Sequence, residues 1–340
     1  MSTSDKICND GASKSNDDND GVCEVNGMLQ NMSTTEEDNN CTDISNTCAN
    51  CGKEGSDMNK CNKCYSVMYC NAACKKKHRS KHKKACDKCV AEVYDEALFK
   101  QPPPQFEDCS ICFLRMPSLA SGRRYKSCCG KSICSGCAFA PVYDDQGNII
   151  FKRKCPFCRT PAPKTDEEII KRVTKQVEVG DTEAMNALGL YYGQGKYGLP
   201  QDYTKALELW MRASELGYAT AYYIIGMVYD AGDDEVEIDK KKATHYFELA
   251  AMGGNAPARH HLGALEENAG NIDRAIKHYM ISVRGGEADS LQKIQQLYKD
   301  GNATKDDYLE ALRAYQEYLA EIKSVQRDNA AEASAEYRYY

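Results

Sequence analysis

Small and apolar residues recur at helical spacing over the second half of the chain, and the spacing itself repeats. The motif Ala-x3-Leu/Ile-Gly begins at Ala184 and returns at Ala221 and Ala258, two steps of 37 residues, with a weaker fourth copy from Ser290. A second segment in each copy carries an aromatic residue: Trp210, Phe247, Tyr279 and Tyr315. A period of this length predicts a solenoid of helix hairpins, in which small residues allow close packing and aromatic side chains fill the layer between adjacent pairs.

The first half of the chain lacks this pattern. Residues 1–47 show no apolar periodicity and contain ten acidic residues against two lysines, so we expect a disordered acidic tail. The segment VAEVYDEALFK (90–100) predicts a short helix, and the three prolines at 102–104 then impose an extended linker. Thr165 and Glu168 have the spacing of a capping box, which places a helix start at this point.

Composition limits the class of protein. A chain of 340 residues with formal net charge −6 is long enough for two or three compact units. It has no secretion signal and no run of about 18 to 20 apolar residues, so we expect a cytoplasmic or nuclear protein without a membrane partner. Sixteen of the nineteen cysteines lie between Cys48 and Cys158, mostly as C-x2-C or C-x3-C pairs. This distribution predicts zinc modules followed by a metal-free domain.

The first cysteine cluster contains eight candidate ligands in four pairs, enough for two tetrahedral zinc ions. The pattern, with Tyr69 before the third pair, resembles the MYND finger over residues 48–86. In that family the pairs interleave, first with third and second with fourth. The resemblance implies one ion on Cys48, Cys51, Cys70 and Cys74, and another on Cys61, Cys64, His82 and Cys86.

A basic run, KKKHRSKHKKA, lies between the last two pairs of this finger. It could bind nucleic acid, but zinc bound by three or four thiolates carries net negative charge that nearby lysines offset, so we favour the second interpretation. Members of the MYND family that bind proline-rich peptides commonly have Gln and Trp where this chain has Lys75 and Arg79. The resemblance therefore implies protein binding in general, without that peptide preference.

The second cysteine cluster resembles a RING finger over residues 108–160, with a linker at 87–107 before it. The resemblance implies a complete four-thiolate site on Cys109, Cys112, Cys134 and Cys137. In the other site, Lys131 stands where the family has a histidine, and an ammonium group has no lone pair to give. Cys129, Cys155 and Cys158 supply three thiolates there. We expect Cys128 to supply the fourth, although three ligands with water, or no second ion, are the alternatives, so the chain would hold three to four zinc ions.

In RING-type ubiquitin ligases the zinc shapes a surface that grips a ubiquitin-conjugating enzyme. By resemblance, Ile111, Pro156 and Arg159 occupy positions of that surface. The usual central tryptophan is absent, and Phe139 or Val142 could replace it. The alternative is that Ile111 is core, Pro156 a turn residue and Arg159 a solvated residue. The intervening segment YDDQGNIIFKRK predicts a β-hairpin with Gly147 in its turn.

The repeat segment resembles the Sel-one-like repeats, relatives of the tetratricopeptide family, which we assign to residues 165–324, with a tail at 325–340. Such domains present concave surfaces to partner proteins. Four tyrosines at equivalent positions could line that surface, although packing between repeats is the commoner role of such residues: Tyr191, Tyr192, Tyr222 and Tyr223.

The predicted architecture is multidomain: two small cross-braced zinc-binding domains and an all-α helical-repeat solenoid after a disordered acidic tail. No catalytic set stands out in the sequence. We expect an adaptor that links protein partners through two zinc fingers and a repeat scaffold. The alternative is a RING-type ubiquitin ligase whose repeats select the substrate and whose finger recruits a ubiquitin-conjugating enzyme. Nucleic-acid binding through residues 75–84 is a weaker third hypothesis.

Overall fold

A computed structural model describes residues 46–340 except 141, 144–145, 147–148, 151–153 and 233–235. The expected acidic tail, 1–47, lies almost wholly outside the described residues. The chain divides into two compact units, Met1–Val93 and Tyr94–Tyr340. In the first unit, a short antiparallel pair of strands precedes one long helix. The strands are β1 (Asn59–Lys60) and β2 (Met68–Tyr69), and the helix is α2 (Ala72–Phe99). The last residues of α2 belong to the second unit.

Helix α2 joins two segments that the sequence analysis separates, the end of the first finger and the helix expected from residue 90. His82, Cys86 and Cys89 are buried, and Val93 is partly buried, at spacings of four, three and four residues. This spacing places them on one face of a continuous helix. No proline or glycine interrupts the segment, so the helix has no reason to end at Cys86.

The second unit contains a small zinc-finger-like segment and a helical solenoid. Its first part has two short antiparallel strand pairs, one 3-10 turn and one five-residue helix. In chain order these are η1 (Ala120–Gly122), β3 (Arg123–Lys126), β4 (Lys131–Cys134), α3 (Ser135–Phe139), β5 (Val142–Tyr143) and β6 (Ile149–Ile150). Strand β3 pairs with β4, and β5 pairs with β6, which is the predicted hairpin; Gly147 lies outside the described residues.

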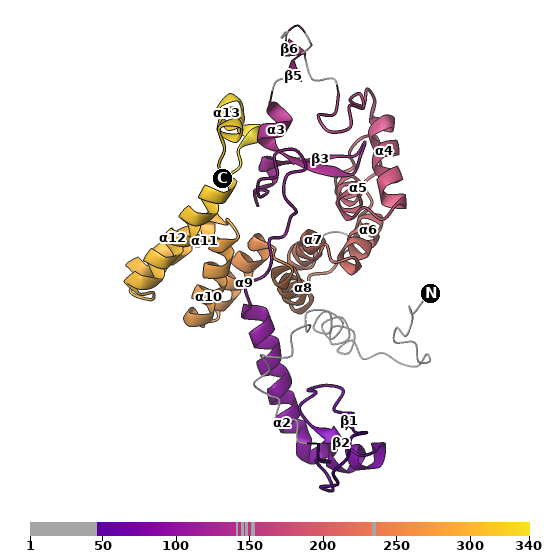
Figure 1. The fold of residues 1–340 in the computed structure, drawn as a ribbon, viewed down its shortest axis with the longest axis vertical. Helices are drawn as coiled ribbons and strands as arrows, with labels where there is room; N and C mark the ends of the chain where they lie inside the picture. The colour runs from indigo at the N-terminus through magenta and orange to yellow at the C-terminus, as the bar shows by residue number, and fades with distance from the viewer. Residues whose placement is uncertain (1–45, 141, 144–145, 147–148, 151–153, 233–235) are drawn as a thin grey trace. The chain divides into compact units, whose positions relative to one another are not determined.

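Helices α4 to α12 follow one another in an arc (Figure 1). Their bounds are α4 (Asp166–Glu178), α5 (Thr182–Gln194), α6 (Tyr203–Glu215), α7 (Ala219–Ala231), α8 (Lys240–Met252), α9 (Ala256–Asn268), α10 (Ile272–Arg284), α11 (Ala288–Lys299) and α12 (Lys305–Ile322). The pairs α5–α6, α7–α8, α9–α10 and α11–α12 form hairpins that correspond to the four sequence copies. Thr165 caps α4 by accepting a hydrogen bond from the Glu168 amide, as the spacing predicts. No described helix has the length and apolar character to cross a membrane.

The repeated glycine and the repeated aromatic residue meet inside each of the first three hairpins. A Cβ atom on Gly226 would lie 2.7 Å from Phe247, and one on Gly263 would lie 2.6 Å from Tyr279. Trp210, displaced by one position in the sequence, lies against Gly189 in the same way. The aromatic ring thus packs on the glycine of its own hairpin, and Phe247 also reaches His261 of the next, with ring centroids 5.2 Å apart. The predicted glycine and aromatic residues therefore do pack against other helices. The aromatic ring contacts the glycine of its own hairpin, however, whereas the prediction placed it between adjacent hairpins.

The segment from residue 94 to 134 runs along the inner side of the arc (Figure 1). At the end of α2, Asp95 pairs with Arg274 at 2.5 Å and Phe99 lies 4.6 Å from the His278 ring. Further along, the side chain of Gln105 contacts Thr220 and accepts a hydrogen bond from Asn255 at 3.3 Å. The inner face of the solenoid is therefore covered here by the preceding part of the same chain.

The last sixteen residues form structure where the sequence analysis expected a tail. They contain helix α13 (Val325–Ala333) and the 3-10 turn η2 (Ala335–Tyr337). Tyr339 is fully buried with Tyr318 and Ile322 of α12, and its hydroxyl donates to Asp328 at 2.5 Å. The polar composition of this segment gives no sign that it packs on the rest of the chain, because its large buried side chains are Arg327 and Tyr339, twelve residues apart.

The glycine–aromatic contact gives a prediction with a definite sign. In an ordinary helix interior, Gly→Ala stabilises by about 1 kcal/mol. We expect Gly226→Ala to destabilise the protein by about 1–3 kcal/mol instead, because the new methyl group overlaps Phe247. Denaturant unfolding monitored by circular dichroism measures this change. The double variant Gly226→Ala/Phe247→Leu is the control, and it should cost less than the sum of the two single variants; a stabilised Gly226→Ala protein would contradict the packing described.

Candidate metal centres and docking surfaces

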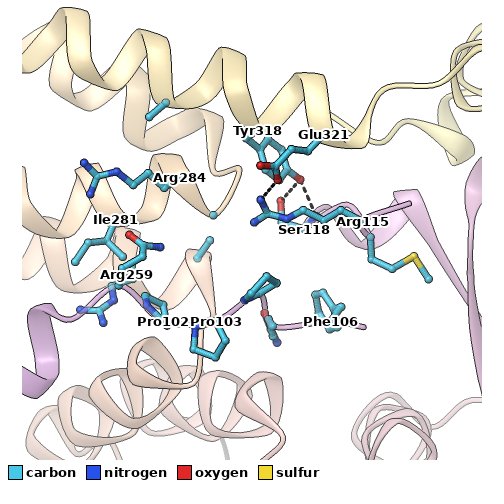
Figure 2. A pocket seen from close by; sticks show the side chains of 18 of the residues that line it. Pro102, Pro103, Phe106, Arg115, Ser118, Arg259, Ile281, Arg284, Tyr318 and Glu321 are labelled. Carbon is cyan, nitrogen blue, oxygen red and sulfur yellow. Dashed lines mark hydrogen bonds and ion pairs between the residues drawn. The ribbon is translucent and has the colours of Figure 1, made fainter. Parts of the chain in front are cut away.

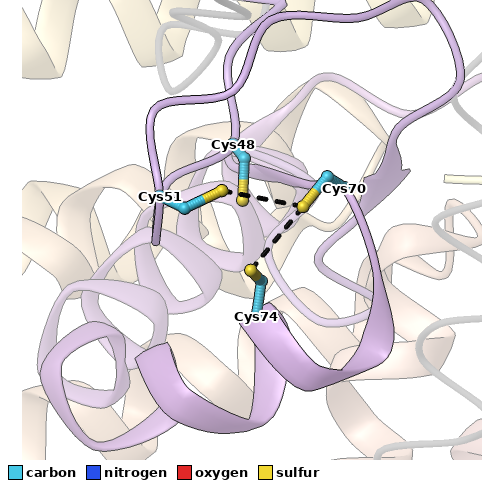
Figure 3. A group of neighbouring side chains, drawn as sticks. All are labelled: Cys48, Cys51, Cys70 and Cys74. Carbon is cyan, nitrogen blue, oxygen red and sulfur yellow. Dashed lines mark hydrogen bonds between the residues drawn. The ribbon is translucent and has the colours of Figure 1, made fainter.

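The first finger brings its eight predicted ligands together in two groups. Figure 3 shows Cys48, Cys51, Cys70 and Cys74 converging from two loops and the start of α2. The Sγ atoms of Cys51 and Cys70 are 3.7 Å apart, and those of Cys70 and Cys74 are 3.6 Å apart. Four thiolates at about 2.3 Å from one zinc ion would be separated by about 3.8 Å, so this group has the size of a tetrahedral zinc site.

The second group of the first finger contains Cys61, Cys64, His82 and Cys86, all buried. The Sγ atoms of Cys61 and Cys86 are 3.8 Å apart, and His82 Nε2 is 3.3 Å from Cys64 Sγ. Burial lowers the pKa of His82, which favours the neutral imidazole that a metal needs. A further thiol, Cys89, is buried beside this group but points at the Cys64 carbonyl at 3.9 Å and belongs to none of the four groups.

The second finger also forms two groups of four. Cys109, Cys112, Cys134 and Cys137 make one, and the Sγ atoms of Cys112 and Cys134 are 3.8 Å apart. The other consists of Cys128, Cys129, Cys155 and Cys158, with ligand atoms all within 4.8 Å of one another. The pairs interleave as they do in the first finger, so each group joins distant parts of the segment.

Adjacent residues Cys128 and Cys129 both reach the same group. Cys128 Sγ lies 3.4 Å from Cys158 Sγ, while the exposed Lys131 starts β4 outside the group. The geometry is possible because Cys129 and Gly130 lie in a tight turn, in which both of their amides donate to the Lys126 carbonyl. Gly130 has a left-handed φ of 63°. The structure therefore places the predicted replacement ligand where a fourth donor is needed.

Four of the C-x2-C pairs, those that begin at Cys48, Cys61, Cys109 and Cys155, share one backbone conformation that the sequence pattern did not indicate. The residue after the second cysteine donates its amide to the carbonyl of the first, at 2.8–3.1 Å, and has positive φ: Gly52, Tyr65, Phe113 and Arg159. This region suits glycine, and a bulky residue there stores strain. Phe113 is 76% exposed, so its conformation is held by the hydrogen bond of the loop and not by packing of its side chain. A large residue at the glycine position of a C-x2-C-G loop is the sequence signal that would have identified it.

The three predicted surface residues of the second finger lie in different environments. Ile111 is half-buried against the apolar cluster around Met116, Pro156 is half-buried, and Arg159 is exposed. Phe139, considered in place of the missing tryptophan, lies 5.4 Å from the Tyr337 ring of η2. Of Val142, only its place in β5 is described.

The second finger is attached to the start of the solenoid through α5. The Tyr125 hydroxyl donates to Asp181, the N-cap of α5, at 2.9 Å. Ser132 donates to Glu183, and Arg123 lies 3.8 Å from the same carboxylate. Burial raises the pKa of Glu183, while the contacts with Ser132 and Arg123 oppose that shift. These polar contacts are sheltered from water, which makes the junction specific for this arrangement.

The same finger is attached to the other end of the solenoid through α12 and α13. Ser118 lies at this junction, where its amide and hydroxyl contact the Tyr318 hydroxyl at 2.8 and 2.9 Å, and Arg115 pairs with Glu321 (Figure 2). A cavity of about 320 Å³ remains between these residues, the linker at 102–106 and helices α9, α10 and α12. Arg115 pairs with Glu321 and Arg284 pairs with Glu310, whereas Arg259 is buried and, among the described residues, its Nε and Nη2 atoms have no hydrogen-bond partner. The second finger thus connects both ends of the repeat array.

The tyrosines considered for partner binding pack within the repeats instead. Tyr222 is buried and stacks on Tyr246, and Tyr223 lies 5.9 Å from Phe247. Tyr191 contacts Tyr197, and the Lys205 ammonium lies over the Tyr192 ring. These contacts agree with the alternative that the four tyrosines pack between helices of the solenoid.

Comparison with known proteins identifies two parts of the chain. The MYND finger model matches residues 48–86, and the Sel1 repeat model matches residues 182–218 and 219–255. Chitin synthase regulatory factor 4 of Schizosaccharomyces pombe is 27% identical over 132 residues, 39% of this chain and 21% of that protein. The ERAD-associated E3 ubiquitin-protein ligase component HRD3B of Arabidopsis thaliana is 28% identical over 113 residues, 33% and 18% of the two chains.

Both alignments span only about a fifth of these curated relatives. Among solved structures, the crystal structure of a Sel1 repeat protein from Oxalobacter formigenes is 26% identical, with a TM-score of 0.40, over 52% of this chain and 67% of that one. The chain therefore contains a MYND finger, which implies zinc binding at residues 48–86, and Sel1 repeats within a mostly helical solenoid.

Proposed function

We propose that this protein is a zinc-dependent adaptor that holds protein partners on its two fingers and on the outer surface of its solenoid. The observation that carries the proposal is Phe113, a large apolar side chain that is 76% exposed on a strained backbone in the second finger. Strain that buys no internal packing is typical of residues kept for recognition. MYND fingers and Sel1 repeats are modules of protein–protein interaction, which supports protein partners.

The covered inner face of the solenoid determines where partners bind. Repeat proteins commonly present their concave side, but residues 94–134 occupy that side here through contacts such as Gln105 with Thr220 and Ser118 with Tyr318. A partner would have to displace these contacts to bind there. We therefore assign partner binding to the exposed knuckles of the fingers, at Tyr65, Phe113 and Arg159, and to the outer helices.

We further propose that the second finger is RING-like in its zinc binding, so that each of the four groups binds one zinc ion. The support is chemical: sixteen soft or borderline ligands fall into four sets of four, each compact enough for tetrahedral zinc. Bound zinc would keep the thiolates deprotonated and together, and the cysteines and His82 would hold it. The function of the zinc here is to shape the fingers.

A direct prediction concerns the number of ions. Native mass spectrometry of the full chain should show four zinc ions, and Cys128→Ser should show three, because the Cys128, Cys129, Cys155 and Cys158 group loses its fourth thiolate. Cys89→Ser is the matched control, since Cys89 is buried but lies outside every group, and it should retain four. Three ions in the wild-type protein, or four in Cys128→Ser, would contradict the assignment of Cys128.

Partner capture tests the adaptor role. Phe113→Ser should remove part of the set of proteins that co-purify with the chain, without changing its melting temperature, because the side chain makes little internal contact. Val179→Ser is the control: Val179 is 72% exposed but has an unstrained backbone at the end of α4. Quantitative mass spectrometry of affinity-purified samples gives the comparison. Equal partner sets for wild type and Phe113→Ser would remove the support for this surface.

The second candidate function is a RING-type ubiquitin ligase. The exposure of Arg159 beside Pro156 favours it, because the RING resemblance places both on the surface that meets a ubiquitin-conjugating enzyme. The contact of Phe139 with Tyr337 disfavours it, since the C-terminal segment lies where the central residue of that surface would bind. We rank the adaptor first for this reason.

An autoubiquitination assay with a panel of conjugating enzymes separates the two candidates. The adaptor predicts no ubiquitin chains with the full-length protein. Chain formation that is lost in Ile111→Ala/Arg159→Ala would establish the ligase, with the predicted surface. Chains that persist in this double variant would place the enzyme-binding surface elsewhere on the finger.

A further inference from the structure

Arg327 of helix α13 is fully buried against the second finger, 0% exposed. Its Nη1 atom donates to the carbonyl oxygens of Arg115 at 2.9 Å and Ile322 at 2.5 Å. Its Nη2 atom lies 3.5 Å from the Leu114 carbonyl and 3.9 Å from Cys112 Sγ. The guanidinium therefore reaches, from the end of the chain, a ligand of the Cys109, Cys112, Cys134 and Cys137 group.

Among the described residues, this buried cation has no carboxylate partner. Within the described part of the chain, no Asp or Glu forms an ion pair with Arg327, and its Nε atom has no hydrogen-bond acceptor. A buried charge without a countercharge is costly, and neutral carbonyls compensate only in part. The cysteine group itself can supply negative charge here, since Cys112 Sγ lies 3.9 Å from Arg327 Nη2. A zinc ion with four thiolates has a net charge of about −2, whereas four neutral thiols have none.

The backbone around Arg327 is fitted closely to the finger. A Cβ atom on Gly136 in helix α3 would lie 2.8 Å from the Arg327 amide nitrogen, so only glycine permits this approach. The Cys137 thiol contacts the Gln326 amide oxygen at 3.9 Å, and Arg124 donates to the Glu336 carbonyl at 2.5 Å. The C-terminal segment is thus attached to the finger on both sides of Arg327.

We propose that Arg327 is an outer-shell residue of a zinc site formed by Cys109, Cys112, Cys134 and Cys137, and that zinc binding there and docking of residues 325–340 stabilise each other. This inference rests on the proposed zinc binding of the second finger. Outer-shell partners orient ligands and tune affinity, and their loss typically weakens metal binding about 10- to 100-fold. By linkage, the loss of this zinc weakens the docking of α13 by the same factor.

A consequence is that zinc occupancy controls access to one face of the finger. While the segment is docked, helix α3 is covered by α13, and Phe139 contacts Tyr337 with 36% of its surface still exposed. When zinc leaves, Arg327 loses its countercharge and the segment loses part of its attachment. The C-terminal residues then become the part of the chain that reports zinc loss, and the α3 face becomes available to a protein partner.

The test measures zinc release from the full-length protein to a chromophoric chelator. Arg327→Gln should release one equivalent of zinc about 10- to 100-fold faster than wild type, while the other three keep their rates. Arg327→Lys retains the charge and should fall between them. Arg338→Gln is the matched control, because Arg338 is exposed on the same segment, and it should behave as wild type.

The wild-type protein provides a second readout that needs no variant. During chelation, amide hydrogen exchange of residues 325–333 should rise with the release of one zinc equivalent and not with the others. Unchanged release in Arg327→Gln, or exchange that does not follow any zinc equivalent, would overturn the coupling. A wild-type protein that contains only two ions, both bound by residues 48–86, would instead overturn the proposed zinc sites on which the coupling depends.

Discussion

The second finger brings four cysteine sulfurs together at each of two points between the ends of the solenoid, and as thiolates they would require a cation among them. Thiolates at separations of 3.4 to 3.8 Å repel one another strongly unless a metal ion compensates their charge. The segment that carries them has only short strands and a five-residue helix of its own. Its shape therefore depends on the cysteine groups, and the contacts it makes with the repeats depend on that shape.

The attachment of the second finger to both ends of the solenoid changes how the terminal helices of the repeats are stabilised. An open solenoid is stabilised by contacts between neighbouring units, and its ends are free to open. Here α5 is tied to the finger through Tyr125 and Asp181, and α13 is tied to it through Arg327. Opening at either end would break contacts with a segment far away in the sequence. The second finger therefore links the two ends of the solenoid, and it does so through polar contacts such as Tyr125 with Asp181 and Arg327 with the Arg115 carbonyl.

The same arrangement separates the covered surfaces of the molecule from the exposed ones. The linker around Gln105 and the finger cover the inner face of the repeats, and α13 covers α3. The residues Phe113 and Arg159 that follow C-x2-C pairs stay exposed on the finger, and Phe113 is 76% exposed. An adaptor that recognises partners through rigid, metal-shaped knuckles is consistent with this distribution.

Much of this could be predicted from local sequence, because zinc ligands and helix hairpins both have short-range patterns. The spacing of the cysteines predicts zinc modules, the resemblance to two finger families implies how the ligands group, and the 37-residue period predicts the helix hairpins with their small and aromatic packing positions. The contact of Gly226 with Phe247 inside one hairpin was not predicted. The attachment of the second finger to both ends of the solenoid could not be predicted, since contacting residues such as Ser118 and Tyr318 are 200 residues apart and have no local sequence pattern. The end of the chain was missed because a buried arginine, Arg327, resembles a solvated one in sequence.

The most direct measurement is a crystal structure with anomalous diffraction data collected at the zinc absorption edge. We expect four anomalous peaks, each from one zinc ion. One of these ions should be bonded to both Cys128 and Cys129, and Arg327 should lie beside the other ion of the second finger. A second finger without zinc peaks, or one with residues 325–340 undocked while its zinc is bound, would contradict it.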